Sequence, residues 1–410
     1  MALLVQKYGG SSIGTINRIE HVAQKIIRMR ALGNQVVVIV SAMYGETDRL
    51  IRLAHTITPH PDPREYDVLL SIGEQMSIAL LSIALNNKQC RARSLTGGQA
   101  GIHTDNTHTN AQILQIDTHI IQRELDQGNV VIIAGFQGIN NQNEITTLGR
   151  GGSDTTAVAI AHALHADECQ IYTDVDGVYT TDPHLIPEAR LIPQICFEEM
   201  LEMASLGAKV LQKRAVEIAS LHNIPIRVLS TFSDGAGTLV AGREKAMQQQ
   251  RTVSGIAFNR EEAMIALSGV PHQAGLENII QDKMHHAHIE IDMVTQNKTT
   301  QNTIDLTVTM PRSDYKKALE LVQDLSQDLG TFSTKTNPKV AKLSLIGTGM
   351  RSALGVISKM LLSLNQEQID IHMITASEIK ISIIVDETSL EQGVRTLHKA
   401  FELDREPVFA

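Results

Sequence analysis

The first 240 residues alternate between two patterns of apolar positions. Short, uninterrupted apolar or β-branched runs are separated by longer stretches in which apolar residues recur at helical spacing, such as Ile19–Met29 and Thr155–Leu164. Uninterrupted runs are typical of central strands in a mainly parallel sheet that helices cover on both faces. The pattern therefore predicts an α/β domain with strands at Leu3–Gln6, Val36–Val40, Val130–Ala134, Gln170–Tyr172 and Ile226–Leu229.

An internal repeat follows a polar segment at residues 241–252, which we interpret as an exposed connector between domains. The repeat has an offset of 80 residues, and each copy reads as a strand, a glycine turn, an amphipathic helix and a strand. This order is half of a βαββαβ unit, so we predict two tandem α+β modules whose sheets pair side by side. The alternative is two unrelated segments with coincident spacing. The matched pairs are Gly269/Gly349, Gly275/Gly355, Ile289/Ile369, Ile291/Ile371, Met293/Met373 and Thr295/Thr375.

Length and composition narrow the class of protein. A chain of 410 residues exceeds what one core usually serves, and 42% hydrophobic with 20% charged residues is ordinary for a globular protein. The net charge of −9, without a Lys/Arg run, argues against a nucleic-acid partner. Three widely spaced cysteines argue against a disulfide framework or a zinc site, and no metal ligands are predicted. The longest uninterrupted apolar run, Val36–Val40, is too short to span a membrane, so we expect a soluble, cytoplasmic protein without a membrane partner.

The first candidate site is the turn Lys7-Tyr8-Gly9-Gly10-Ser11-Ser12, between the strand that starts at Leu3 and a helical stretch from Asn17. Glycines let backbone N–H groups approach anionic oxygens, and the lysine supplies a mobile cation. The turn therefore predicts a phosphate site, although it lacks the spacing of a Walker loop and could be only a turn.

A second glycine turn, Thr147–Thr156, carries denser chemistry. Arg150 can bind a carboxylate or phosphate with two hydrogen bonds, and Gly151 and Gly152 expose backbone donors. Ser153 and Asp154 stand where we expect the N-cap of the following helix, and capping alone is the alternative role of Asp154.

A third segment, Tyr172–Pro183, is an acidic loop with glycine and proline after a strand. It could contact a nucleotide or magnesium, or it could be a solvated turn. Thr47, Glu74 and Lys209 complete this set of candidates, although each is an ordinary residue in isolation.

Together these segments resemble the amino acid kinase family, and within it the aspartate kinases, over essentially all 410 residues. The block Arg150–Ala157 is the most specific part of the resemblance. The repeated modules resemble the paired ACT domains of that family, which bind end-product amino acids. The resemblance implies an amino acid kinase fold, a mainly parallel sheet between helices, followed by two ferredoxin-like α+β ACT modules. The implied domains are a catalytic domain at 1–245, a linker and first regulatory strand at 246–260, and ACT domains at 261–338 and 339–410.

The resemblance also implies the roles of individual residues. Lys7 would stabilise the transferring phosphoryl group with Gly9 and Gly10, and Asp154 would orient Lys7. The residues implied to bind aspartate are Thr47, Glu74, Arg150, Gly151, Gly152 and Ser153; Glu74 would meet the ammonium group and Arg150 the α-carboxylate. Those implied to line the ATP site, with Mg²⁺ bridging the phosphates, are Lys7, Tyr8, Gly9, Gly10, Thr173, Asp174, Tyr179, Asp182, Lys209 and Val210. Those implied to bind an effector are Gly275, Asp292, Gln296, Asn297, Gly355, Asp370, Ser377 and Glu378.

The implied reaction transfers the γ-phosphoryl group of ATP to the β-carboxylate of L-aspartate and gives 4-phospho-L-aspartate, the first step of aspartate-family amino acid biosynthesis. Feedback by lysine or threonine would act through ACT modules in a homodimer or tetramer. Two alternatives are a catalytically silent amino-acid sensor on the same fold and a kinase with another acceptor. Every position needed for catalysis is filled, which argues against the sensor. The sequence leaves open the downstream pathway, the choice between dimer and tetramer, and a shorter regulatory polypeptide starting at Met247.

The effector loops depart from the pattern of relatives that lysine and threonine inhibit. The chain reads Pro271-His272-Gln273-Ala274-Gly275 in the first copy, with Ala353-Leu354-Gly355 and Thr375-Ala376-Ser377-Glu378 in the second. His272 replaces a carboxylate of those relatives that could bind the ammonium group of lysine. Ala376 replaces a residue whose hydroxyl could donate a hydrogen bond. We therefore hypothesise that inhibition by lysine is altered or lost.

Overall fold

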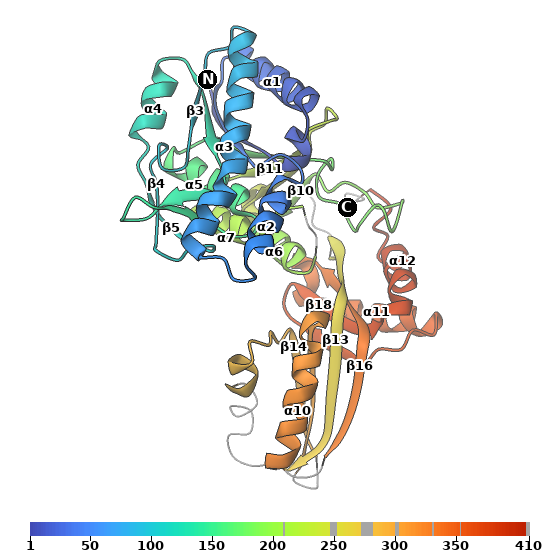
Figure 1. The fold of residues 1–410 in the computed structure, drawn as a ribbon. Helices are drawn as coiled ribbons and strands as arrows, with labels where there is room; N and C mark the ends of the chain where they lie inside the picture. The colour runs from blue at the N-terminus through green and yellow to red at the C-terminus, as the bar shows by residue number, and fades with distance from the viewer. Residues whose placement is uncertain are drawn as a thin grey trace. The chain divides into compact units, whose positions relative to one another are not determined.

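The computed structural model describes residues 1–207, 210–246, 252–271, 282–299, 303–329, 332–352 and 354–406. These residues fall into two compact units (Figure 1). The described residues of 1–179, 191–205 and 209–249 form the first unit, and those of 180–190, 206–208 and 250–410 form the second.

The first unit is built on an eight-stranded sheet in the order β10-β12-β11-β9-β1-β2-β6-β3. All neighbouring strands are parallel except the antiparallel pair β11 and β12. The five strands predicted from apolar runs are the central ones, which confirms the α/β class. The bounds are β1 Leu3–Tyr8, β2 Gln35–Val40, β3 Ala92–Leu95, β6 Val130–Ala134, β9 Glu168–Thr173, β10 Gln194–Cys196, β11 Ile226–Ser230 and β12 Thr238–Ala241.

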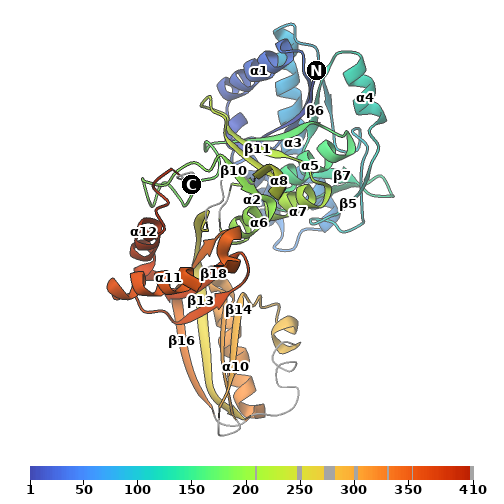
Figure 2. The same ribbon diagram turned by 180° about the vertical axis from the view of Figure 1, so that it is seen from behind.

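Helices cover both faces of this sheet (Figures 1 and 2). α1 and α3 pack together on one face, where Ile26, Leu81 and Val38 share a core, and α5 packs with α7 on the other face. A small sheet in the order β5-β4-β7-β8 lies beside it in the chain's first unit. The remaining bounds are η1 Gly10–Ile13, α1 Ile16–Ala31, α2 Glu46–Ile57, α3 Pro63–Asn87, β4 Ile102–Thr104, β5 Ile113–Ile116, α4 His119–Asp126, β7 Gln137–Ile139, β8 Ile145–Thr147, α5 Gly152–Ala163, α6 Phe197–Ser205, α7 Lys213–His222 and α8 Arg243–Ala246.

Among the described residues, α3 is the one helix long and apolar enough to cross a membrane. It begins at an Asp62 cap, whose carboxylate accepts the N–H groups of Arg64 and Glu65. Its most apolar stretch is 56% buried within the unit, and Leu81 and Leu85 are fully buried. This burial identifies α3 as a core helix. The apolar runs do not single it out, because Ser71, Glu74 and Gln75 interrupt its apolar residues.

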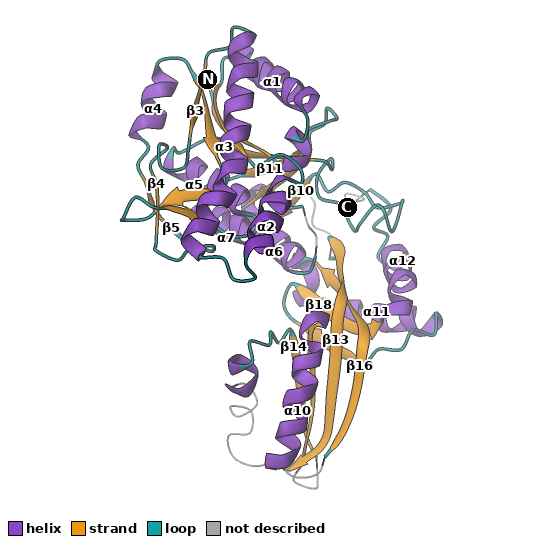
Figure 3. Ribbon diagram, viewed as in Figure 1, coloured by secondary structure: helices purple, strands orange, loops and turns teal. Residues whose placement is uncertain are grey.

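The second unit contains one antiparallel six-stranded sheet in the order β14-β15-β13-β16-β18-β17 (Figure 3). Its central strands are long. Ile256 and Ile265 of β13 lie in two different hydrophobic clusters, and β16 contributes Leu343 to the first of these and Val340 to a third, smaller cluster. Each βαββαβ module is therefore completed by half of a strand that continues into the other module. The bounds are β13 Gly255–Pro271, β14 Met293–Lys298, β15 Thr303–Pro311, η3 Arg312–Asp314, α10 Tyr315–Leu329, β16 Ser333–Ile346, η4 Thr348–Ser352, α11 Leu354–Gln366, β17 Met373–Ala376, β18 Lys380–Asp386, η5 Glu387–Ser389 and α12 Leu390–Ala400.

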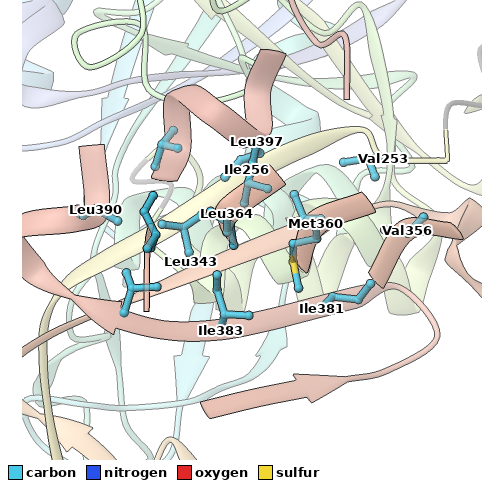
Figure 4. Packing of buried hydrophobic residues seen from close by; sticks show 14 of the residues in the cluster. Val253, Ile256, Leu343, Val356, Met360, Leu364, Ile381, Ile383, Leu390 and Leu397 are labelled. Carbon is cyan, nitrogen blue, oxygen red and sulfur yellow. The ribbon is translucent and has the colours of Figure 1, made fainter. Parts of the chain in front are cut away.

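Residues 180–190 belong to the second unit although they lie far earlier in the chain. Ile186 joins the core that Figure 4 shows between α11, α12 and the sheet. The backbone N–H of Ile256 donates to Thr180 O at 2.7 Å, and the Thr180 hydroxyl lies 2.9 Å from His398 Nε2. The chain thus enters this unit in more than one segment, and no change in composition along the sequence indicates this. The predicted connector at 241–252 also needs correction, because it begins with the end of β12 and contains α8; residues 247–251 lie outside the described part.

Candidate active site

The carboxyl ends of three central strands meet at one edge of the first sheet. Tyr8 of β1 pairs with Val40 of β2 and with Tyr172 of β9, so the turns after these strands start side by side. The rings of Tyr8 and Tyr172 stack with centroids 4.6 Å apart, which ties β1 to β9 at this edge. Ligands of open α/β sheets bind at such edges.

Lys7 and Asp154 form an ion pair at this edge. Lys7 Nζ lies 2.7 Å from Asp154 Oδ1, and their side chains are only 13% and 8% exposed. The N-cap prediction for Ser153 and Asp154 is wrong: α5 starts at Gly152 after Gly151, whose φ is +72°. Asp154 therefore lies in the first helical turn, where its carboxylate is directed to Lys7 rather than to the helix end.

The glycines after Lys7 are required by close packing. A Cβ at Gly10 would lie 2.9 Å from Ala42 O, so a larger residue would push the turn away from β2. A Cβ at Gly9 would lie 3.4 Å from Lys7 Nζ, and the Gly9 N–H donates to Tyr172 O at 3.4 Å. The Lys7 amine therefore lies against the backbone of Gly9, where a side chain would crowd it.

Glu74 contributes a buried carboxyl group to the site. It is 3% exposed, and its Oε1 accepts the backbone N–H of Ala42 at 2.9 Å. Its other oxygen, Oε2, is buried and has no hydrogen-bond partner among the described residues. Burial raises the pKa of Glu74 to about 8, and the bond from Ala42 opposes this only in part. A buried oxygen without a partner is costly, which points to a cationic ligand group at this position.

Gly73 lets α3 deliver Glu74 to the site. A Cβ at Gly73 would lie 2.7 Å from Ala42 Cβ. Ala42 is therefore approached from two sides, by Gly10 of the lysine turn and by Gly73 with Glu74 of α3. The lysine turn and the buried carboxylate are packed around the same short segment after β2.

The glycine turn after β8 presents a further cation, Arg150. Arg150 is exposed and makes no hydrogen bond or ion pair with any described residue, so its guanidinium is open to a ligand. Ser153 is buried, and Thr47 lies half-buried in the first turn of α2. Gly151 and Gly152 are tightly packed, since Cβ atoms there would lie 2.1 Å from Gln212 Cγ and 2.9 Å from Phe136 Cδ2.

Two residues of this region are not singled out by the sequence analysis. Gly135 follows β6 at the same sheet edge, and a Cβ there would lie 2.8 Å from Ser153 Oγ. Phe136 adopts a left-handed φ of +69° and donates its N–H to Thr156 Oγ1 at 3.1 Å. The available signal is the one used for Lys7, a glycine directly after an apolar strand.

The residues expected to line a nucleotide site are only partly brought together. Thr173 ends β9 and donates to Asp174 Oδ1 at 3.1 Å, and Tyr179 donates to Asp176 Oδ2 at 3.4 Å. Val210 lies half-buried in the first unit. Asp182 belongs to the second unit, and Lys209 lies outside the described residues, so the roles of both stay predictions.

The described members of the predicted effector set lie in the second unit, most of them on or beside the two edge strands of its sheet. Gln296 and Asn297 are exposed on β14, and Asp292, which directly precedes β14, pairs with the buried Lys342. Asp370, Ser377 and Glu378 flank β17 and are exposed; Gly355 is exposed near the start of α11. Gly275 and His272 lie outside the described residues.

This arrangement offers a cation, an unpartnered buried carboxylate and an open guanidinium. Such a set can hold a ligand that carries both an ammonium and a carboxylate group, next to a second anion at Lys7. Phosphate and carboxylate groups are the anions that lysine and exposed glycine backbone favour.

Comparison with known proteins gives concordant matches. A family model described as "Amino acid kinase family" matches residues 2–230, and an ACT domain model matches residues 343–401. An aspartokinase of Pseudomonas aeruginosa is 53% identical over 405 residues, covering 98% of each chain. Aspartokinase III of Escherichia coli in complex with aspartate and ADP superposes with a TM-score of 0.77 at 25% identity, covering 97% of this chain and 99% of that one. The same enzyme with lysine and aspartate gives 0.76 at 26%, with the same coverage.

Proposed function

Because this chain belongs to the amino acid kinase family and is one of its aspartate kinases, we propose that the site at the edge of the first sheet transfers the γ-phosphoryl group of ATP to the β-carboxylate of L-aspartate. The product is 4-phospho-L-aspartate, from which aspartate-family amino acids are made. The observation that carries the proposal is the buried Oε2 of Glu74, which lacks a partner among the described residues and suits the ammonium group of aspartate.

The proposed chemistry needs charge neutralisation rather than a base. The side-chain carboxylate of aspartate, with a pKa near 3.9, is already ionised at neutral pH. The barrier comes from bringing this anion to the γ-phosphate, so positioning and positive charge supply the catalysis. Lys7 neutralises the transferring phosphoryl group, and Asp154, 2.7 Å away, fixes the direction of its amine.

The remaining side chains divide between the two substrates. Glu74 meets the ammonium group and the open guanidinium of Arg150 meets the α-carboxylate, while Thr47, Gly151, Gly152 and Ser153 complete the aspartate site. Tyr8, Gly9, Gly10, Thr173, Asp174, Tyr179 and Val210 line the proposed ATP site, and for Asp182 and Lys209 the same role rests on the resemblance alone. The resemblance supports each role, and the shared edge of β1, β2 and β9 supports the grouping of those residues that lie in the turns after these strands.

We include Mg²⁺ in the proposal as a companion of the nucleotide. Among the described residues no cluster of three or more His, Cys, Asp or Glu side chains could hold a metal ion. Mg²⁺ commonly binds through substrate phosphates, water and one or two carboxylates, so it needs no such cluster. When bound, it neutralises phosphate charge; Asp174, exposed after β9, is the carboxylate we expect nearest to it.

The direct test measures ADP release from ATP and Mg²⁺ with L-aspartate, glutamate or acetylglutamate, while hydroxylamine traps any acyl phosphate. We expect hydroxamate to form with aspartate only. Preference for another acceptor would overturn the assignment of Glu74 and Arg150 to aspartate. ATP binding without turnover would favour a regulatory sensor.

The raised pKa of Glu74 predicts a pH dependence for aspartate capture. Below pH 8 this side chain is mostly protonated in the free enzyme and offers no charge to the ammonium group; above pH 8 it is ionised. We therefore expect kcat/KM for aspartate to rise about tenfold per pH unit up to about pH 8 and then to level, since kcat/KM reports groups of the free enzyme. The range from pH 6 to 9 extends about two units below and one unit above that pKa. A value of kcat/KM for aspartate that stays constant over this range would contradict the prediction.

We also propose the domain limits and assembly that the resemblance implies: a catalytic domain at 1–245, a linker with the first regulatory strand at 246–260, and ACT domains at 261–338 and 339–410. The long β13 supports a coupled ACT pair, because it serves both cores and pairs with β16 from Gly255 to Ser268. Exposed edge strands β14 and β17 can pair with a second copy, so we propose a homodimer or tetramer with effector sites along these edges. We also propose that the protein is soluble and cytoplasmic; the core position of α3 argues that this apolar helix does not span a membrane.

The effector loops give a prediction about feedback. Because His272 replaces a carboxylate and Ala376 lacks a hydroxyl, lysine alone loses two polar contacts, and we expect millimolar lysine to inhibit weakly or not at all. The measurement is hydroxamate formation with lysine, threonine or both. Strong inhibition by lysine alone would contradict the hypothesis.

A further inference from the structure

A buried carboxylate that the proposed chemistry does not use lies on α3, before Glu74. Asp67 is fully buried, and both of its oxygens accept hydrogen bonds. The Thr147 hydroxyl donates to Oδ1 at 2.5 Å, and the Thr109 N–H lies 3.1 and 3.0 Å from the two oxygens. His108 Nδ1 lies 2.8 Å from Oδ2. Asp67 therefore ties α3 to two segments that are distant in the sequence.

Both segments form the base of the loop that carries Arg150. Thr147 ends β8, and its carbonyl accepts the Ala111 N–H at 2.9 Å. Gly149 has a φ of +75°, and a Cβ there would lie 2.8 Å from Asn110 Oδ1. The segment after Thr109 thus packs directly against the loop, while the Arg150 side chain stays exposed.

A second tie closes the same base. The Arg214 guanidinium donates to Leu148 O at 3.3 Å and to Ala111 O at 3.2 Å. Arg214 holds the loop from α7, and Asp67 holds it from α3. The backbone on either side of the loop is therefore fixed. The Arg150 side chain at its tip makes no hydrogen bond or ion pair with any described residue.

The position of Asp67 relative to Glu74 gives this tie a functional meaning. The two residues are seven positions apart in one continuous helix, which places them on the same face about two turns apart. Glu74 Oε1 is bonded to the segment after β2, and Asp67 is bonded to the base of the arginine loop. α3 thus sets the distance between Glu74, which is proposed to bind the ammonium group, and the loop of Arg150, which is proposed to bind the α-carboxylate.

We propose that Asp67 is a positioning residue for the acceptor substrate: through Thr147 and Thr109 it fixes the loop of Arg150 and Ser153 at a set distance from Glu74. The inference rests on the proposed function and adds to it how the two groups that meet the α-ammonium and the α-carboxylate of the acceptor are held relative to each other. α3 sets the separation of these two groups. Nucleotide binding does not depend on this tie.

Thr147→Val tests the inference, because it replaces the hydroxyl on Asp67 by a methyl group of similar size. Loss of a hydrogen bond to a charged group predicts a rise in KM for aspartate of about tenfold, with KM for ATP changed less than about twofold. Thr147→Ser keeps the hydroxyl and is expected to restore KM for aspartate. Asp67→Asn, which keeps the shape and removes the charge, should act in the same direction as Thr147→Val.

Thr146→Val is the matched control. Thr146 is the neighbouring residue and is equally buried, but its hydroxyl lies 2.6 Å from Thr104 Oγ1 and not at Asp67. It should leave both KM values unchanged. The inference is overturned if Thr147→Val has the same KM for aspartate as an active wild-type chain, even if the variant melts at a lower temperature. It is also overturned if Thr146→Val raises the KM for aspartate as much as Thr147→Val does. A wild-type chain without aspartate-dependent turnover would overturn the proposed function itself.

Discussion

Lys7→Ala is expected to reduce turnover by about 10³-fold or more, the largest loss from any single substitution in this chain. Lys7 is the cation at the shared edge of β1, β2 and β9, and its amine is aimed by Asp154 at 2.7 Å. Without it, the charge of the transferring phosphoryl group meets no side-chain cation at this position. The measurement is aspartate-dependent hydroxamate formation, with ATP binding followed separately by calorimetry.

Removing Lys7 leaves the buried carboxylate of Asp154 without its partner, which can destabilise the fold. Lys7→Arg keeps the charge, but a guanidinium is larger than the amine that lies 3.4 Å from the Cβ position of Gly9. We expect this variant to fold and to lose about 10²-fold in turnover. Lys88→Ala is the control, because Lys88 makes a surface ion pair with Glu20 at 2.6 Å and should be dispensable. Near-normal turnover of Lys7→Arg and Lys7→Ala would refute the role.

Glu74→Gln is expected to raise KM for aspartate about 10²-fold and to leave KM for ATP nearly unchanged. The substitution keeps the size of the side chain and its bond to the Ala42 N–H, which Oε1 accepts at 2.9 Å. It removes the only charge that Glu74 can offer to the ammonium group. The same variant should lose the rise of kcat/KM toward pH 8, since that rise reports ionisation of the wild-type carboxyl.

Two comparisons separate this effect from a general loss of structure. Glu46→Gln makes the same change at a carboxylate of α2 that pairs with Arg49 at 2.7 Å, and it should leave KM for aspartate unchanged. Succinate, which lacks the ammonium group, should bind the wild type weakly and should gain relative to aspartate in Glu74→Gln. An unchanged preference for aspartate over succinate would show that Glu74 does not bind the ammonium group.

The local pattern predicts more of the fold than of the site. The strands at Val36–Val40 and Val130–Ala134 match β2 and β6 in the structure, since an apolar run reports burial of a strand directly. α3 is missed as an element because its polar residues interrupt the run. Ser71 is buried and donates its hydroxyl within the helix, and Glu74 points into the site. Polar residues that serve function thus blur the signal of the helix that carries them.

The N-cap prediction for Asp154 also shows that a local pattern does not identify the role of a site residue. An aspartate after a glycine turn is typical of an N-cap, and spacing alone favours that role. Gly151, with φ at +72°, lets the helix begin earlier, at Gly152, so the carboxylate is free to pair with Lys7 from a distant strand. Only the resemblance linked the two residues, because 147 positions separate them in the chain.

The sequence by itself determined the α/β class and the glycine turns, because these depend on residues that are neighbours in the chain, and it determined the repeated modules, because their matching residues recur at one fixed offset. The tertiary structure alone decided that Glu74 keeps one buried oxygen without a partner among the described residues. It also decided that Asp67 ties α3 to the arginine loop, and that β13 serves two cores. The physical reason is that backbone periodicity is set locally, whereas burial, pKa and close approach depend on which distant segments pack together.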